Sequence, residues 1–390
     1  MEVFSFSFWA YGSVWLFFIC LGLQRFSSSA IVLTPALLVY CVLIVILEWL
    51  CHVYLPTALG IFLLSGACWY VLGVISPRKM LPVSGKAVFI TGCDSGFGKA
   101  AAYKLDSMGF QVIASVLNVD GPGAKELQQM CSDRLKLIQV DLTKPKDIQK
   151  ALQLTKSQTI GTGLWGLVNN AGMCVHFGDA ELSLMSNYRG CMEINFFGTL
   201  EITKAFLPLL RCSKGRIVTI SSPAGDQPFP FLAAYGSSKA ALNRVMDMFR
   251  HELRSWGVKV SIIQPGSYKT GPLKDMSYWD HQYEHHLANL SEELLQDYGD
   301  EYLSETKRLF LKYGDTAKED LTPVVECITD ALLAAEPKVR YFTDKGVWLI
   351  YFIAGYMPFF FSDKFFRGLF QNNRVIPRAL RNQQKQSGEE

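Results

Sequence analysis

Three long apolar stretches occupy the beginning of the chain. They cover residues 4–23, 31–50 and 55–75, and each is close to the ~20 residues that an apolar helix needs to cross a bilayer. Because only short hinges separate them, the pattern predicts a membrane anchor over residues 1–80 with about three transmembrane helices. Buried core helices would give a similar pattern and are the alternative interpretation.

Basic residues beside these stretches predict their orientation. Arg25 lies in the first hinge, Arg78 and Lys79 follow the third stretch, and the second hinge contains no Lys or Arg. The positive-inside rule then places the first hinge and everything after residue 75 in the cytoplasm. A cleaved signal peptide is a poor interpretation of the first stretch, because its leading segment contains Glu2 and no basic residue.

From residue 86 onward, short β-branched runs alternate with segments of helical spacing. Strands are predicted at KAVFITG, FQVIASVL, LKLIQVDL, GLWGLVNNAG, GRIVTISS and VKVSIIQPG. Apolar strands that alternate with helices are typical of a parallel sheet covered on both faces. The pattern therefore predicts an α/β domain over residues 81–345, built on a doubly wound, Rossmann-type parallel sheet.

Two later segments depart from this alternation. Residues 274–315 are helical in pattern, charged and aromatic, which predicts an insertion after the sixth strand that covers a substrate pocket. Residues 346–390 begin with an apolar stretch that Pro358 interrupts and end in a polar tail expected to be disordered. We expect the apolar stretch to contact the membrane surface, and packing against the domain is the alternative.

Composition narrows the classes of function. The net charge is only +3 and the basic residues are scattered, so no nucleic-acid partner is expected. The ten cysteines form no C-x-x-C pair and no Cys/His cluster with zinc spacing. His281, His285 and His286 lack matching ligands around them and are interpreted as a solvated helix face. No metal site is expected.

A glycine-rich turn, ITGCDSGFGK, joins the first predicted strand to the first predicted helix. Gly92, Gly96 and Gly98 carry no Cβ, so the backbone can turn tightly and a pyrophosphate can approach the N-terminus of the helix. Such a turn is weak evidence alone, but its place in a βαβ unit predicts a dinucleotide site.

The residues around this turn favour NAD over NADP. Neither the turn, which holds Asp94 and Ser95, nor the end of the second strand offers a Lys or Arg for a 2′-phosphate. Asp94 would repel that phosphate, whereas Asn118 could hydrogen-bond a free ribose hydroxyl.

A reactive group is predicted on the helix over residues 232–255. Tyr235 and Lys239 are four residues apart and therefore lie on one helical face. An ammonium near a phenol favours the phenolate and lowers its pKa, which would let Tyr235 take a proton from an alcohol. Ser222, at the end of the fifth strand, could hydrogen-bond the same oxygen.

In these motifs the chain resembles the short-chain dehydrogenase/reductase family. TGCDSGFG, NNAG at 169–172, NFFG at 195–198, Ser222, YGSSK and QPGSYKT stand in the family's order. The resemblance implies that Ser222, Tyr235, Lys239 and Asn195 are catalytic, with Asn195 interrupting a helix and positioning a proton-relay water.

The resemblance also implies that Asp141 lies near the adenine, that Asn169 lies beneath the cofactor and that Thr270 bonds the nicotinamide amide. Together, the motifs and the resemblance predict these cofactor-binding residues: Gly92, Asp94, Ser95, Gly96, Phe97, Gly98, Asn118, Asp141, Asn169, Ala171, Gly172, Tyr235, Lys239, Pro265 and Thr270. Ser222, Tyr235 and Phe229 are expected to contact the substrate, and ordinary packing is the alternative for Phe229.

Within the family, four short sequence segments resemble those of membrane-bound hydroxysteroid dehydrogenases: KLDSMGF, DLTKP, SPAGD and WGVKVSIIQPG. This implies NAD-dependent oxidation of the 11β-hydroxyl of a glucocorticoid at the endoplasmic reticulum membrane, with the catalytic domain facing the cytoplasm. Oxidation of the 17β-hydroxyl of estradiol or testosterone is the alternative substrate class. A catalytically silent, membrane-bound steroid-binding or scaffold protein is the alternative of another kind. Family analogy alone suggests a homodimer.

Overall fold

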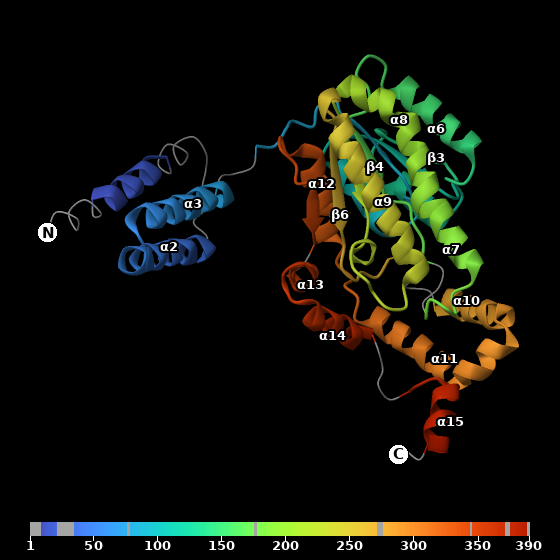
Figure 1. Ribbon diagram of the computed structural model, residues 1–390. Coiled ribbons are helices and arrows are strands. Elements are labelled where there is room, and N and C mark those ends of the chain that lie inside the picture. The colour runs from blue at the N-terminus through green and yellow to red at the C-terminus, as the bar shows by residue number, and fades with distance from the viewer. Residues whose placement is uncertain are drawn as a thin grey trace. The chain divides into compact units, whose positions relative to one another are not determined.

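The computed structural model describes residues 9–21, 35–75, 79–174, 178–270, 276–343, 345–370 and 375–387 (Figure 1). The chain divides into two compact units, Met1–Lys79 and Met80–Glu390. We describe each unit separately.

The first unit is helical where the three apolar stretches occur. It contains a helical segment over residues 9–21, α2 (Pro35–Tyr54) and α3 (Thr57–Ile75). Tyr11, Cys51 and Leu64 are buried in a small core shared by these segments. Over the residues that the structure describes, no helix reaches the length and apolar character that crossing a membrane requires.

A sheet of seven parallel strands forms the centre of the second unit, in the order β3-β2-β1-β4-β5-β6-β7. The strands are β1 (Ala87–Ile90), β2 (Gln111–Val116), β3 (Leu135–Gln139), β4 (Gly166–Asn169), β5 (Arg216–Ile220), β6 (Lys259–Gln264) and β7 (Arg340–Phe342). The order reverses between β1 and β4, and ligands of such sheets bind at the carboxyl ends of the strands near this point. The predicted Rossmann-type sheet is confirmed.

Helices cover both faces of the sheet (Figure 1). The covering helices are α4 (Gly96–Ser107), α5 (Pro122–Met130), α6 (Pro145–Gln158), α7 (Met185–Met192), α8 (Thr199–Ser213), α9 (Ala233–Glu252) and α12 (Thr322–Leu333). Alternate residues of β1 point to opposite faces of the sheet. Val88 and Ile90 join the core beneath α4 and α12, whereas Ala87 and Phe89 join the core beneath α6, α8 and α9. Three shorter helical segments are η1 (Glu193–Gly198), η2 (Pro223–Gly225) and η3 (Leu253–Trp256).

The segment between β6 and α12 forms two helices, α10 (Met276–Asn289) and α11 (Glu292–Asp315). Its helical character agrees with the prediction, but the interpretation of its histidines as a solvated face is wrong for His286. His286 is only 4% exposed, because it lies seven residues from the buried Trp279 and therefore on the same helical face.

The C-terminal residues form α13 (Lys345–Tyr356), α14 (Phe359–Phe370) and α15 (Arg378–Ser387). The apolar stretch is buried at Val347 and Phe366 but exposed at the turn between its two helices, where Phe359 is 83% exposed. The expectation of a disordered tail is wrong over α15. Arg378 and Arg381 form ion pairs with Asp300 and Glu301 of α11, and these hold the polar helix in place.

The sequence pattern did not indicate β7. This strand has three residues and pairs with β6 at the edge of the sheet. A run this short carries too little periodicity to be recognised as a strand. Its place in the sheet brings the chain back beside β6 immediately before α13 begins.

Candidate active site

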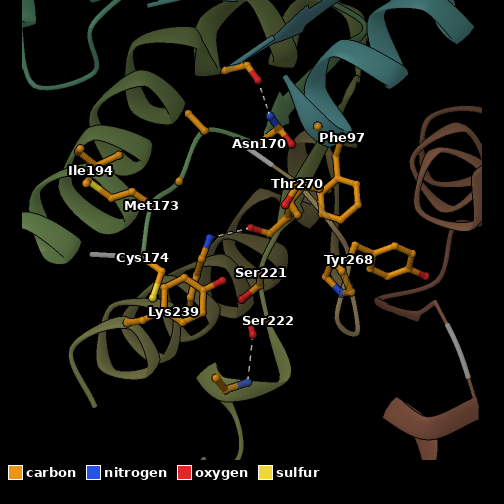
Figure 2. Close-up of a pocket in the computed structure, with 18 of the residues that line it drawn as sticks. Phe97, Asn170, Met173, Cys174, Ile194, Ser221, Ser222, Lys239, Tyr268 and Thr270 are labelled. Atoms are coloured by element: carbon orange, nitrogen blue, oxygen red, sulfur yellow. Dashed lines mark hydrogen bonds between the residues drawn. The ribbon is translucent and has the colours of Figure 1, made fainter. Parts of the chain in front are cut away.

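A cavity of about 590 Å³ lies at the carboxyl ends of β1, β4, β5 and β6 (Figure 2). Its wall contains most of the predicted site residues: Gly92, Asp94, Ser95, Gly96, Phe97, Asp141, Ala171, Gly172, Ser222, Phe229, Tyr235, Lys239, Pro265 and Thr270. Four predicted residues are absent from the described wall, namely Gly98, Asn118, Asn169 and Asn195.

Tyr235 and Lys239 lie one turn apart on α9, as the spacing predicts, and both face the cavity. The Lys239 Nζ atom is 5.8 Å from the centre of the Tyr235 ring. It donates a hydrogen bond of 3.0 Å to the backbone carbonyl of Ile220 at the end of β5. Lys239 is only 3% exposed, so this bond fixes a cation that water barely reaches.

Burial dominates the protonation of both groups. It lowers the pKa of Lys239 to about 8 and raises the pKa of Tyr235 above its ordinary value. The nearby Cys174 and Cys191 raise the Tyr235 pKa further, and a hydrogen bond from Ser222 lowers it. The expected lowering of the Tyr235 pKa is therefore wrong for this cavity taken alone, because the loss of hydration disfavours the phenolate more than the Ser222 hydrogen bond favours it.

Ser222 follows β5 and is the N-cap of η2, where its Oγ atom accepts a 3.2 Å hydrogen bond from the backbone N–H of Ala224. This contact fixes the side chain beside Tyr235. Ser221 also reaches the cavity wall (Figure 2), although only Ser222 was predicted as a site residue.

Asn195 lies behind the wall rather than in it. The residue is fully buried in η1, a π-helical turn that joins α7 to α8, so the predicted interruption of a helix is present. Its side chain accepts a 2.8 Å hydrogen bond from the Met173 N–H and donates 2.9 Å bonds to the Met173 carbonyl and to Ser238. Asn195 thus fixes the backbone of Met173, which does line the cavity.

The glycine turn packs too closely for side chains. Gly96 has a φ of +57°, and a Cβ there would lie 3.0 Å from the Cβ of Thr270. Gly98 lies outside the wall, but a Cβ there would lie 2.3 Å from the carbonyl oxygen of Gly92. The three glycines therefore leave exposed backbone at the N-terminus of α4, where an anion is favoured.

Asp94 joins this turn to the end of β2. Its carboxylate accepts hydrogen bonds of 2.9 Å from the N–H of Leu117 and 3.3 Å from the N–H of Asn118. The Asn118 side chain is used elsewhere, because its Oδ1 atom accepts a 3.0 Å bond from the N–H of Asp120. The structure places Leu117, not Asn118, on the wall.

Of the two adjacent asparagines, Asn170 and not the predicted Asn169 lines the cavity. Asn169 is buried and donates a 2.9 Å hydrogen bond to Thr203, away from the cavity. Asn170 lines the wall and donates 2.8 Å bonds to the carbonyls of Thr91 and Gly92. The first asparagine is the last residue of β4, so the alternation along the strand could have indicated the second.

Part of the wall is apolar and comes from segments far apart in the sequence. Phe229 belongs to the loop before α9, and Trp279 and Phe310 come from α10 and α11, with their rings 4.6 Å apart. Val347 and Ile350 come from α13. Phe310 and the two α13 residues were not predicted, because no local motif marks them.

A family model for short-chain dehydrogenases matches residues 86–280, which contain the glycine turn, Ser222, Tyr235 and Lys239. The chain belongs to the short-chain dehydrogenase family. It is therefore an oxidoreductase.

Relatives of this short-chain dehydrogenase extend the match over most of the chain. It is 50% identical over 372 residues to 11-beta-hydroxysteroid dehydrogenase type 2 from Bos taurus and from Homo sapiens, covering 95% of this chain and 92% of each relative. It is 41% identical over 331 residues to 17-beta-hydroxysteroid dehydrogenase type 2 from Homo sapiens, covering 85% and 86%.

A solved short-chain dehydrogenase from Streptomyces avermitilis has the same fold, with a TM-score of 0.56 and 23% identity over 78% of this chain and 98% of that one. The site also fits the nicotinamide dinucleotide of the family. The close contacts at Gly96 and Gly98 leave room only for backbone, which is the cradle that a pyrophosphate requires. Across the described residues, no three His, Cys, Asp or Glu side chains gather into a metal site.

Gly98→Ala should weaken the binding of NAD at least tenfold, because the new methyl group would clash with the Gly92 carbonyl and with Asn170. Isothermal titration of NAD into the full chain measures this. Gly190→Ala is the control, since nothing lies within 4 Å of a Cβ in that helix. Equal NAD affinity for Gly98→Ala and the wild type would contradict the proposed path of the dinucleotide.

Lys239→Met should change the pH dependence of stability. The folded pKa of about 8 lies below the ~10.4 of an unfolded lysine, so the unfolded chain binds more protons between these values and wild-type stability rises with pH there. The free energy of unfolding of the variant minus that of the wild type should fall by about 2–3 kcal/mol from pH ~7 to ~10. Chemical denaturation measures it. The exposed Lys104→Met should give a constant difference, and a constant difference for Lys239→Met would refute the buried charge.

Proposed function

We propose that this protein oxidises the 11β-hydroxyl of glucocorticoids such as cortisol to a ketone, with NAD as the hydride acceptor. The observation that carries the proposal is 50% identity over 95% of the chain to 11-beta-hydroxysteroid dehydrogenase type 2. The cavity supports the coarser part of the proposal, an alcohol with a large apolar body, because both polar and aromatic side chains line it.

The side chains that line the cavity fit a rigid apolar alcohol as substrate. Ser222 and Tyr235 offer polar atoms to one substrate oxygen, while Phe229, Trp279 and Phe310 offer aromatic surface. A largely apolar pocket with a few convergent polar groups binds a ligand by burying its apolar area and orients it by hydrogen bonds. A steroid alcohol has this distribution of surface.

In the proposed reaction Tyr235 takes the proton of the substrate hydroxyl. When bound, oxidised nicotinamide supplies the hydride acceptor and a positive charge. Ser222 holds the tyrosine and the substrate oxygen by hydrogen bonding, which lowers the pKa of Tyr235. The pKa of about 8 keeps Lys239 mostly protonated at neutral pH, so its ammonium opposes the effect of burial on the phenolate.

The charges on the wall favour NAD over NADP. Among the described residues that line the cavity, Lys239 is the one Lys or Arg, and it lies beside Tyr235. Asp94 holds the end of β2, where a 2′-phosphate would approach, and its carboxylate would repel that group. NAD carries a hydroxyl at this position and meets no such repulsion.

A 17β-hydroxysteroid is the second candidate substrate. The 41% identity to human 17-beta-hydroxysteroid dehydrogenase type 2 supports it, and the wall shows no feature that prefers one hydroxyl position. A silent binding protein is disfavoured, because Ser222, Tyr235 and Lys239 meet in one cavity.

We propose further that the protein resides in the endoplasmic reticulum membrane with its catalytic unit in the cytoplasm. Large apolar side chains on α2 and α3 support this, since Val42, Phe62 and Trp69 are all more than half exposed. Arg78 and Lys79 follow the third apolar stretch and favour the cytoplasmic side for what comes after.

The substrate proposal is tested by incubating membranes that contain the full chain with cortisol, estradiol, testosterone or retinol, each with NAD or NADP. Cortisol with NAD should give the highest kcat/KM. Preference for estradiol would select the 17β alternative, and no turnover of any alcohol would favour the silent protein.

Tyr235→Phe should lower kcat at least a thousandfold and leave the affinity for NAD within about threefold, because only the proton-accepting oxygen is lost. Single-turnover production of NADH and an NAD titration measure the two effects. Tyr188→Phe is the control, because Tyr188 is a half-buried residue of α7 that does not line the cavity. Steroid oxidation by Tyr235→Phe at the wild-type rate would show that another group is the base.

A further inference from the structure

A hydrogen bond joins the C-terminal helix α13 to the turn that follows Ser222. The Tyr351 hydroxyl donates to the carboxylate of Asp226 over 2.6 Å. Burial raises the pKa of Tyr351, and the bond to Asp226 raises it further, so the phenol keeps its proton at physiological pH. Tyr351 is therefore a permanent donor to this carboxylate.

Side chains from three other elements contact the Asp226 carboxylate and fix its position. Asn243 of α9 donates to it over 2.7 Å, and Gln264 of β6 donates over 2.8 Å. The Arg340 guanidinium of β7 lies 3.7 Å away and also pairs with Asp247 at 2.8 Å. The Tyr351 hydroxyl thus connects α13 to a carboxylate whose position α9 and β6 already fix.

A second contact joins the same two parts of the chain. The ring of Phe366 in α14 lies 5.8 Å from the ring of Phe229, edge to face. Phe229 and Asp226 both belong to the short loop between Ser222 and the start of α9. The two C-terminal helices therefore pack on the loop that links two predicted catalytic residues, and Figure 1 shows α13 and α14 at this end of the sheet.

The face of α13 that carries Tyr351 also forms part of the cavity. Val347 and Ile350 line the wall, and they lie four residues and one residue before Tyr351. Residues i and i+4 share a helical face, so moving Tyr351 away from Asp226 would move Val347 with it. From these contacts we infer that Tyr351 is a positioning residue that sets the affinity for steroid by holding the α13 wall. The inference rests on the proposed steroid substrate.

Removing the hydroxyl alone should separate this role from packing. The Tyr351 ring also contacts Phe342 of β7 at 4.7 Å, and a phenylalanine keeps that contact. Tyr351→Phe therefore deletes the hydroxyl's bond to Asp226 and its contact with Gln264, while the ring stays. Tyr356→Phe is a matched control, because it makes the same change on the same helix at a residue that is 81% exposed.

The experiment uses the full chain in detergent and makes three measurements on the wild type and both variants: steady-state kinetics with cortisol, affinity for NAD and hydrogen exchange. Tyr351→Phe should raise KM for cortisol about tenfold with kcat within about twofold, since the wall is displaced and the reacting groups are not. Its affinity for NAD should be unchanged, and hydrogen exchange of the α13 amides should accelerate. Tyr356→Phe should match the wild type in all three, and melting curves confirm that every variant is folded.

Other results would overturn the positioning role of Tyr351 or the proposed function. Equal KM for the two variants, or a fall in kcat at unchanged KM, would overturn the inference. If the wild type oxidises no steroid, the proposed function fails and hydrogen exchange alone tests the bond. In that case equal α13 exchange in the two variants overturns its positioning role, and faster exchange in Tyr351→Phe supports it.

Discussion

The site depends on keeping one positive charge almost out of water. Lys239 is buried on α9, and the carbonyl of Ile220 is the backbone acceptor that holds its ammonium at the end of β5. Burying a charge is costly, so the fold tolerates it only where a firm partner is present. The parallel sheet provides that partner, because its strand ends present backbone carbonyls at one edge. Ser222 leaves the same strand end and meets Tyr235 from the other side.

Local patterns in the sequence predict the parts of the site that local geometry determines. Gly92, Gly96 and Gly98 mark the turn because only a missing Cβ allows the approaches to Ala171, Thr270 and Gly92 that the fold contains. Tyr235 and Lys239 share a face because four residues make about one helical turn. The strands up to β6 are recognisable because a sheet buried on both faces needs continuous apolar runs.

Other residues of the site depend on contacts between distant segments, which no local pattern encodes. Asn118 and Asn169 have side chains that could bind a cofactor. In the structure Asn118 accepts a hydrogen bond within a turn, and Asn169 donates one to Thr203. Phe310, Val347 and Ile350 line the cavity only because α11 and α13 pack against it in the folded chain. The burial that raises the Tyr235 pKa likewise follows from the assembled walls, so a spacing of four residues could predict the pairing of the two groups and not its protonation.

The late position of α13 in the chain has a consequence for synthesis on the ribosome. Tyr235 and Lys239 are translated more than a hundred residues before Val347 and Ile350. A nascent chain can therefore pair the first six strands and form the glycine turn while one side of the cavity is still missing. During that interval the aromatic side chains that would line the pocket are exposed to solvent. Exposed apolar surface favours aggregation with other unfolded chains. Completion of the last helices ends this exposure, so premature termination would leave the reactive residues present but the pocket open.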